Sequence, residues 1–136
     1  MSIAATCAGI VAIGRTVAGI VSADDPPPEK LDSAQMPALY VFTGPATYDT
    51  STAGFHRETR QYRVRVAVAP NGQATPPVIE TRVRTLLPLV SAALIAAPTL
   101  SRQVWQATVL GDSGVILLPE YGAVGFELRL EVLDDC

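Results

Sequence analysis

The fold is decided by the stretch TRQYRVRVAV, residues 59–68, which lies inside a strand predicted over residues 56–69. Apolar and charged side chains alternate along this strand. The apolar positions are Tyr62, Val64, Val66 and Val68, and the arginines of opposite parity are Arg57, Arg63 and Arg65. Successive side chains of a strand point to opposite faces of the sheet. The pattern therefore predicts a sheet with one dry face and one wet face.

Four further strands are predicted, each a short apolar run bounded by turn residues. They cover residues 38–43, 104–110, 115–118 and 123–133. The last of them repeats the alternation. Its apolar face carries Val124, Phe126, Leu128, Leu130 and Val132, and its polar face carries Glu127, Arg129 and Glu131. The turns that separate the last three strands are predicted at residues 111–114 and 119–122.

A first helix is predicted near the N-terminus, where Ile3, Cys7, Ile10, Val17 and Val21 recur at helical spacing. The other side of this helix carries alanine, glycine, threonine and isoleucine rather than charge. A helix that is apolar almost all round is buried on more than one side. The sheet of a small domain covers one side, so we expect the second side to meet another subunit.

A second helix is predicted to start at Thr75-Pro76-Pro77, with a threonine hydroxyl as the cap and proline in the first turn. Pro88 falls within its pattern and removes one backbone donor, so we expect a kinked or split helix. Pro98 ends it. The apolar stripe of this helix consists of Val83, Leu86, Leu87, Val90 and Leu94.

Two segments lack a period. Residues 24–37 contain Pro26-Pro27-Pro28 and predict a stiff proline-rich connector on the surface. Residues 44–55 begin with Gly44-Pro45 and are small and polar; we expect a mobile loop or the tip of a long hairpin, ordered by a partner. The order α-β-β-α-β-β-β predicts a single α+β domain over residues 1–136, with a mainly antiparallel sheet of about five strands and two helices packed on one face.

The composition indicates a protein that works with a partner. Of 136 residues, 49% are apolar and only 17% are charged, whereas globular domains usually have about 25% charged residues. We therefore expect another chain to cover part of the surface. The net charge of −3 is too weak to indicate a nucleic-acid or membrane-surface binder. Cys7 and Cys136 have no metal-type spacing and predict a reduced compartment, with one buried thiol and one on the tail.

The N-terminal run leaves one alternative open. Between Ser2 and Ala23 the only charged residue is Arg15, and the run ends in a small-residue pattern that a signal peptidase accepts. No lysine or arginine precedes the run, and Arg15 and three glycines interrupt it. We therefore expect no membrane span. A secreted or membrane-attached binding domain stays as an alternative function.

We expect no catalytic residue, no cofactor and no metal. Gly111-Asp112-Ser113-Gly114 is similar to the tetrapeptide around a serine-protease nucleophile, but catalysis needs a histidine within reach and His56 is the only one. A tight turn requires the same residue types. A small hydrolase that uses Ser113 is kept as an alternative. For metal binding, His56 has only Glu58 beside it, and no glycine-rich phosphate loop follows a strand.

The densest charge cluster has two interpretations. It consists of Arg57, Arg60, Arg63 and Arg65. It is either a solvated sheet face or an electrostatic surface for a protein or for passing nucleic acid. In the second case we predict a subunit or lumen interface in which the arginines pair with carboxylates of a neighbouring copy. The candidate interface residues are Arg57, Arg63, Arg65, Glu127 and Glu131.

Several features of the layout occur together. An N-terminal helix is followed by the connector PPPE at residues 26–29, the strand entry MPALYV at residues 36–41 and the long strand TRQYRVRV at residues 59–66. A helix and a final strand near the C-terminus complete the order. Over most of the chain this layout resembles the tail terminator, or tail completion, proteins of tailed bacteriophages.

The resemblance implies a structural virion protein that forms a ring, usually a hexamer, on the last ring of the tail tube. Such a ring ends tube polymerisation and docks the tail to the head. The implied partners are further copies of the chain, the tail-tube protein and the neck or connector proteins, with DNA only passing through and no membrane. Assembly is implied in the host bacterial cytoplasm. Phage neck proteins have similar small α+β folds, so a head–tail connector adaptor is the alternative.

Overall fold

The computed structural model describes residues 3–52 and 55–135 and has an α+β fold. Within these described residues, two α-helices and six strands follow one another, with short 3-10 turns at Ser33–Gln35 and Pro119–Tyr121. The helices are α1 (Ile3–Arg15) and α2 (Pro76–Ile95). The strands are β1 (Ser22–Ala23), β2 (Ala38–Thr52), β3 (Phe55–Pro70), β4 (Gln106–Asp112), β5 (Ile116–Leu118) and β6 (Ala123–Asp135).

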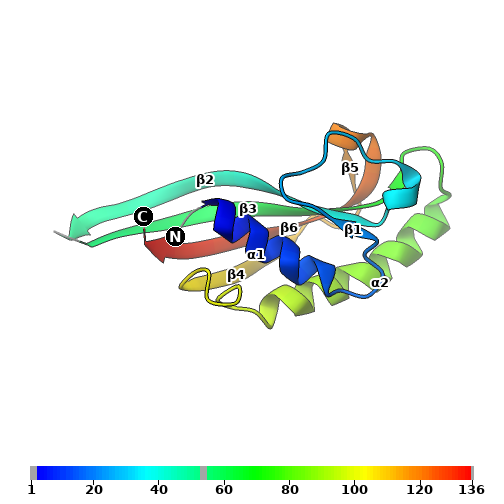
Figure 1. Cartoon of the computed structure of the whole chain (residues 1–136). Helices are drawn as coiled ribbons and strands as arrows, with labels where there is room; N and C mark the ends of the chain where they lie inside the picture. Colours follow the sequence, from blue (N-terminus) through cyan, green and yellow to red (C-terminus); the bar gives the residue numbers. More distant parts are fainter. Residues whose placement is uncertain (1–2, 53–54, 136) are drawn as a thin grey trace.

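The strands form one sheet in the order β1-β2-β3-β6-β4, and β5 pairs with the start of β6. All pairings are antiparallel except that of β1 with β2. Both helices pack on the same face of this sheet (Figure 1). The predicted fold class is therefore confirmed. The strand that the sequence analysis did not predict is the two-residue β1.

The main core lies between the helices and the sheet. Val64, Val66 and Val68 of β3 are fully buried on this side, with Phe126 of β6 and Ile10 of α1. The alternation predicted for β3 is thus correct. The strands approach closely at Gly125, where a Cβ atom would lie 1.8 Å from the carbonyl oxygen of Val66. Only glycine fits this position of the β3–β6 ladder.

The first helix is shorter than its apolar pattern predicted. It ends at Arg15, and Gly19 has a φ of 95°, which a helix cannot contain. Val21 is 60% exposed, so its place in the predicted stripe was wrong. Gly14 packs against Leu39 of β2, where a Cβ would lie 2.7 Å from a leucine methyl group. This contact holds the end of α1 close to the sheet.

Of the two alternatives predicted for residues 44–55, a loop or the end of a long hairpin, the structure shows the hairpin over residues 44–52. β2 continues through Gly44-Pro45 to Thr52, with a register irregularity between Thr43 and Ala46. Proline is tolerated there because β1 pairs only with the first two residues of β2, which leaves the rest of β2 an edge strand. Residues 53–54 lie outside the described residues.

The second helix is neither capped nor divided as predicted. The hydroxyl of Thr75 makes no capping hydrogen bond, and α2 runs without interruption through Pro88. Pro88 is exposed, so water can solvate the carbonyl group that the missing N–H leaves free. The helix stops at Ile95, before Pro98. The strand predicted over residues 104–110 starts later than expected. Val104 is buried in the preceding loop, and β4 starts at Gln106.

Candidate functional site

The face of the sheet opposite the helices, called the outer face below, is covered at one end. A second apolar cluster there consists of Met36, Tyr40, Ala67, Leu118 and Ala123. The connector and the β5 segment lie beside it at this end of the molecule (Figure 1). The prediction of one dry and one wet face was therefore wrong in this region, because the connector and β5 bury the end of the outer face.

A polar network borders this cluster. The hydroxyl of Tyr40 donates to Oε1 of Glu120 at 2.7 Å, and Nη1 of Arg65 donates to the same oxygen at 2.9 Å. Nε of Arg65 donates to Oε1 of Glu127, also at 2.9 Å. One arginine thus joins the β5–β6 turn to the middle of the sheet.

The network changes the acidity of its members. Burial raises the pKa of Glu120, but the hydrogen bonds from Tyr40 and Arg65 outweigh burial and hold that pKa below its ordinary value. Burial and the Glu120 carboxylate raise the pKa of Tyr40 far above its ordinary range. Glu120 is therefore the charged centre of the network and Tyr40 stays a neutral donor.

The structure separates the predicted interface residues. Glu127 forms an ion pair with Arg65 of the same chain. These two residues therefore do not need a neighbouring copy to neutralise their charges. Arg57 lies over the ring of Trp105, 5.5 Å from its centroid. Glu131 is partly buried and lies beside Gln61 in the β3–β6 ladder.

Arg63 is exposed, and its neighbour across the β3–β6 ladder is unexpected. The register of β3 and β6 places it directly opposite Arg129. Both side chains are exposed, and neither forms a hydrogen bond or ion pair with any described residue. Sequence reasoning placed Arg129 on the polar face but missed it as a site residue. Only the strand register, which the sequence does not give, brings the two arginines together.

Arg60 does not belong to the same surface. Its side chain lies on the helix side, where it forms an ion pair with Glu58 and donates to the Tyr48 hydroxyl at 2.9 Å. It also donates to the carbonyl oxygen of Gly44 at 3.0 Å, across the irregularity in β2. Arg60 therefore holds the projecting half of the hairpin together. In the part of the chain described, no three potential ligands cluster as a metal site would require.

Ser113 lies in a turn and not in a catalytic arrangement with His56. Its hydroxyl donates to the carbonyl oxygen of Gly114 at 2.8 Å and accepts the Glu127 N–H at 2.9 Å. Glu127 pairs with Arg65, nine residues along β3 from His56. At about 3.3 Å per residue this separation is roughly 30 Å, so the two side chains cannot meet.

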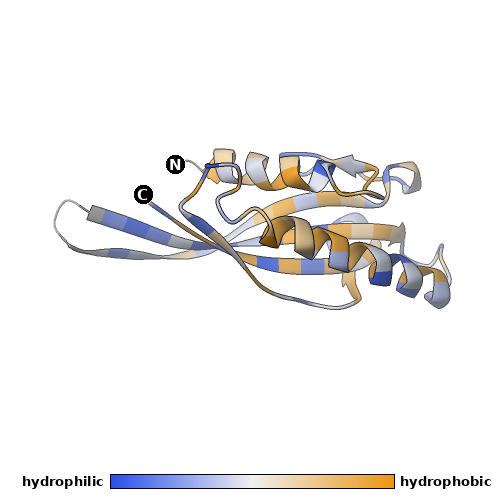
Figure 2. Cartoon of the chain, turned by 90° about the horizontal axis from the view of Figure 1, so that it is seen from below, coloured by the Kyte–Doolittle hydropathy of each residue, from blue (hydrophilic) through white to orange (hydrophobic). Residues whose placement is uncertain are grey.

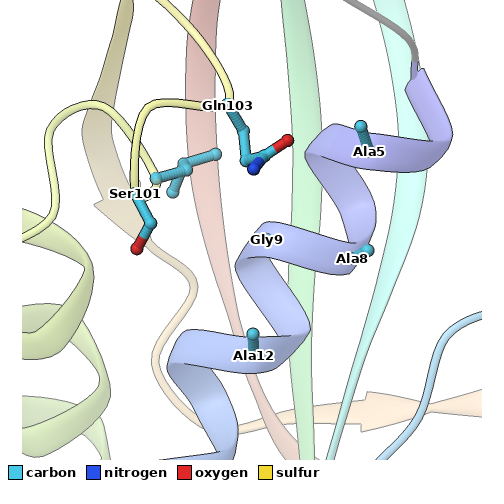
Figure 3. A pocket seen from close by; sticks show the side chains of 7 residues that line it. Ala5, Ala8, Gly9, Ala12, Ser101 and Gln103 are labelled. Atoms are coloured by element: carbon cyan, nitrogen blue, oxygen red, sulfur yellow. The ribbon is translucent and has the colours of Figure 1, made fainter.

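An open apolar groove lies along α1. Ala5, Ala8, Gly9 and Ala12 form one wall, and the loop after α2, with Ser101 and Gln103, forms the other (Figure 3). The groove has a volume of about 390 Å³. Leu100, Ser101 and Arg102 have positive φ angles of 47°, 57° and 68°. Three consecutive non-glycine residues in this conformation turn the loop toward α1.

The first cysteine is inert by its position. Cys7 is a buried residue of α1, and its Sγ lies 3.9 Å from the hydroxyl of Thr43 in β2. Burial raises the pKa of the Cys7 thiol. The prediction of a buried thiol is confirmed for Cys7, while Cys136 lies outside the described residues.

Comparison with known proteins adds no relative. A scan against models of protein families finds no match for the chain, and a search of curated proteins finds none either. Within residues 3–52 and 55–135, no helix has the length and hydropathy needed to cross a membrane.

Proposed function

We propose that the chain is a ring-forming structural protein that caps the tail tube of a bacteriophage, ends tube polymerisation and docks the tail to the head. The observation that carries the proposal is the open face of α1. One side of this helix is buried on the sheet through Ile10 and Val11, while Ala8 and Ala12 on the other side are exposed. Such a surface supports a contact between subunits.

The overall shape supports the same function. The β2–β3 hairpin projects beyond the helical layer, and its projecting half is largely hydrophilic (Figures 1 and 2). Tyr48 of this half is 57% exposed. A projecting, polar hairpin gives each subunit of a ring an arm that can reach the next component. We assign it to contact with the tail-tube protein or with the neck proteins.

The layout of the elements is the second support. The N-terminal helix, the proline-rich connector, the long β3 and the long final strand occur in the order on which the resemblance to tail terminators rests. Capping requires a surface that stops further tube subunits from adding. A closed ring provides one, because every copy uses its lateral surfaces on its neighbours. DNA passes through such a ring without sequence-specific contacts.

The test is polymerisation of a phage tail-tube protein in the presence of this chain, with tube length measured by electron microscopy. Wild-type protein should shorten the tubes and bind at their ends. Ala8→Glu places a charge in the α1 groove and should abolish capping. Ala92→Glu makes the same change at an exposed position of α2 outside the groove and should leave capping intact.

The result that overturns the proposal is tube growth that wild-type protein does not change. Binding to the head connector together with unchanged tube growth would favour the adaptor function instead. Circular dichroism of both variants checks that the helices are retained. Loss of capping by both variants alike would remove the α1 groove from the argument.

A further inference from the structure

The outer face of the sheet contains a charge arrangement that the fold does not explain. Arg63 and Arg129 stand directly opposite each other in the β3–β6 ladder. Like charges at directly opposed positions of a sheet destabilise it. The next arginine along β3, Arg65, has two carboxylates within 2.9 Å, but Arg63 has none. The pair is therefore unbalanced within the chain.

The guanidinium of Arg129 extends away from β3. Its Nη2 atom lies 3.7 Å from the point that a Cβ on Gly111 of β4 would occupy. The two arginines thus spread over the outer face. A carboxylate placed between two guanidinium groups accepts charge-assisted hydrogen bonds from both and offsets their repulsion.

The chain contains an unbalanced acidic segment that matches this pair. Asp24, Asp25 and Glu29 lie in the connector, and none of the three forms a hydrogen bond or ion pair with any described residue. The segment is held in place at both ends. Nε of Arg15 donates to the carbonyl oxygen of Ala23 at 2.9 Å. At the other end, the hydroxyl of Tyr121 donates to the carbonyl oxygen of Pro28. Carboxylates on an anchored segment lose little freedom on binding.

We infer that the Arg63–Arg129 pair is the receptor for the acidic connector, residues 24–29, of a second copy of this chain. The inference rests on the proposed ring and names one of its contacts. A head-to-tail contact joins two unlike patches of opposite charge on one chain, and here neither patch has an ion-pair partner among the described residues.

The surroundings of the pair favour a protein over nucleic acid. Glu127 and Glu131 lie two residues from Arg129 on either side, on the same face of β6. A phosphate backbone has a charge on every nucleotide and would lie against these carboxylates, whereas the connector brings only three carboxylates, and Lys30 follows Glu29 directly. The aromatic residue Phe42 lies opposite Arg63 in the β2–β3 ladder, and the guanidinium of Arg65 lies over its ring, 5.5 Å from the centroid. Base stacking on it is therefore blocked.

The experiment uses charge reversal with rescue. Arg63→Glu with Arg129→Glu reverses the receptor, and Asp25→Arg with Glu29→Arg reverses the connector. Like charges then face each other at every contact, so each variant alone should assemble at least about tenfold more weakly than wild type. An equimolar mixture should recover wild-type assembly, because each variant complements the other. A ring of six can form from strictly alternating chains.

The control is Arg82→Glu with Arg84→Glu, which makes the same change in net charge at two exposed arginines of α2, outside the pair and outside the α1 groove. It should assemble like wild type. Assembly is measured by light scattering, and melting temperature checks the fold of each variant. Mixtures that fail to recover assembly, or a control as weak as the receptor variant, would overturn the inference.

The outcomes separate the inference from the proposed function. If both charge-reversal variants assemble as strongly as wild type, the connector contact is contradicted, but the proposed ring is not. A wild-type chain that stays monomeric, alone and with tail-tube protein, contradicts both. A short DNA duplex that binds wild type but not the receptor variant would assign the pair to nucleic acid and also overturn the inference.

Discussion

The two faces of β3 show how one alternating strand meets two different environments. On the helix side, Val64 and Val66 are fully buried under α1 and α2. On the outer face, Arg65 is fixed by carboxylates while Arg63, two residues away, is exposed and faces another arginine. The helices of the same chain bury the apolar residues on the helix side of the sheet. On the outer face, the connector and β5 cover one end of the sheet, and the rest, with Arg63 and Arg129, stays exposed. This exposed part is where we expect a partner to bind.

The largest effect is expected where the backbones of β3 and β6 approach closely. Gly125→Ala drives a Cβ into the carbonyl of Val66, and backbone atoms cannot move aside without opening the β3–β6 ladder. We expect a loss of about 3 kcal/mol or more in the free energy of unfolding, measured by urea denaturation. Gly111→Ala is the control, because its Cβ would make an ordinary 3.7 Å contact; its cost should stay within about 0.5 kcal/mol. Equal losses would mean that the close approach at Gly125 is wrong.

The second prediction compares two arginines on the outer face. Arg65→Ala leaves Glu120 and Glu127, both largely covered, without their donor and should cost about 1–3 kcal/mol of stability. Arg63→Ala removes a like-charge opposition and should leave stability unchanged or slightly higher. Thermal melts of both single variants decide this.

The third prediction concerns pH. The pKa of Glu120 is lower in the folded chain than its ordinary value of 4.5, so the unfolded chain takes up this proton first as pH falls. Its contribution to stability is present above pH 4.5 and is lost as pH falls through the lowered folded pKa. Glu120→Gln removes this contribution and should flatten that part of the stability profile. A variant that follows the wild-type acid profile would contradict the role of Glu120 in the network.

The smallest effect is expected at Cys7. With Cys136→Ser as background, the remaining thiol should react slowly with a thiol reagent at neutral pH, because burial raises the pKa of Cys7 and its side chain is buried where α1 packs on the sheet. Denaturant should restore the rate of a free thiol. Fast labelling of the native protein would show that α1 separates readily from the sheet.

Much of the fold could be predicted from side-chain periodicity. The period of two in β3 and β6 identified the strands and their buried residues, because burial selects the same parity along each strand. Helix ends were less certain: the apolar run after Arg15 continues the helical pattern, but Gly19 adopts a conformation that ends it. Gly44-Pro45 indicated a strand end, yet an unpaired edge tolerates proline.

The candidate site could be predicted only in part. The arginines of β3 were visible in the sequence, but their partners depend on register. Glu127 meets Arg65, and Arg129 meets Arg63, only because β6 pairs with β3 in one alignment. The covering of the outer face by the connector joins segments far apart in sequence, such as Tyr121 and Pro28. Local patterns contain no information about such contacts.

The most direct test of the account is the mass of the assembled protein, measured by light scattering over a range of concentrations. The open face of α1 predicts a closed oligomer, and the resemblance to tail terminators puts it near six times the 14.3 kDa of one chain. Ala8→Glu should return the mass to that of one chain, while Ala92→Glu should not. A wild-type chain that stays at 14.3 kDa at high concentration and with tail-tube protein would contradict the account.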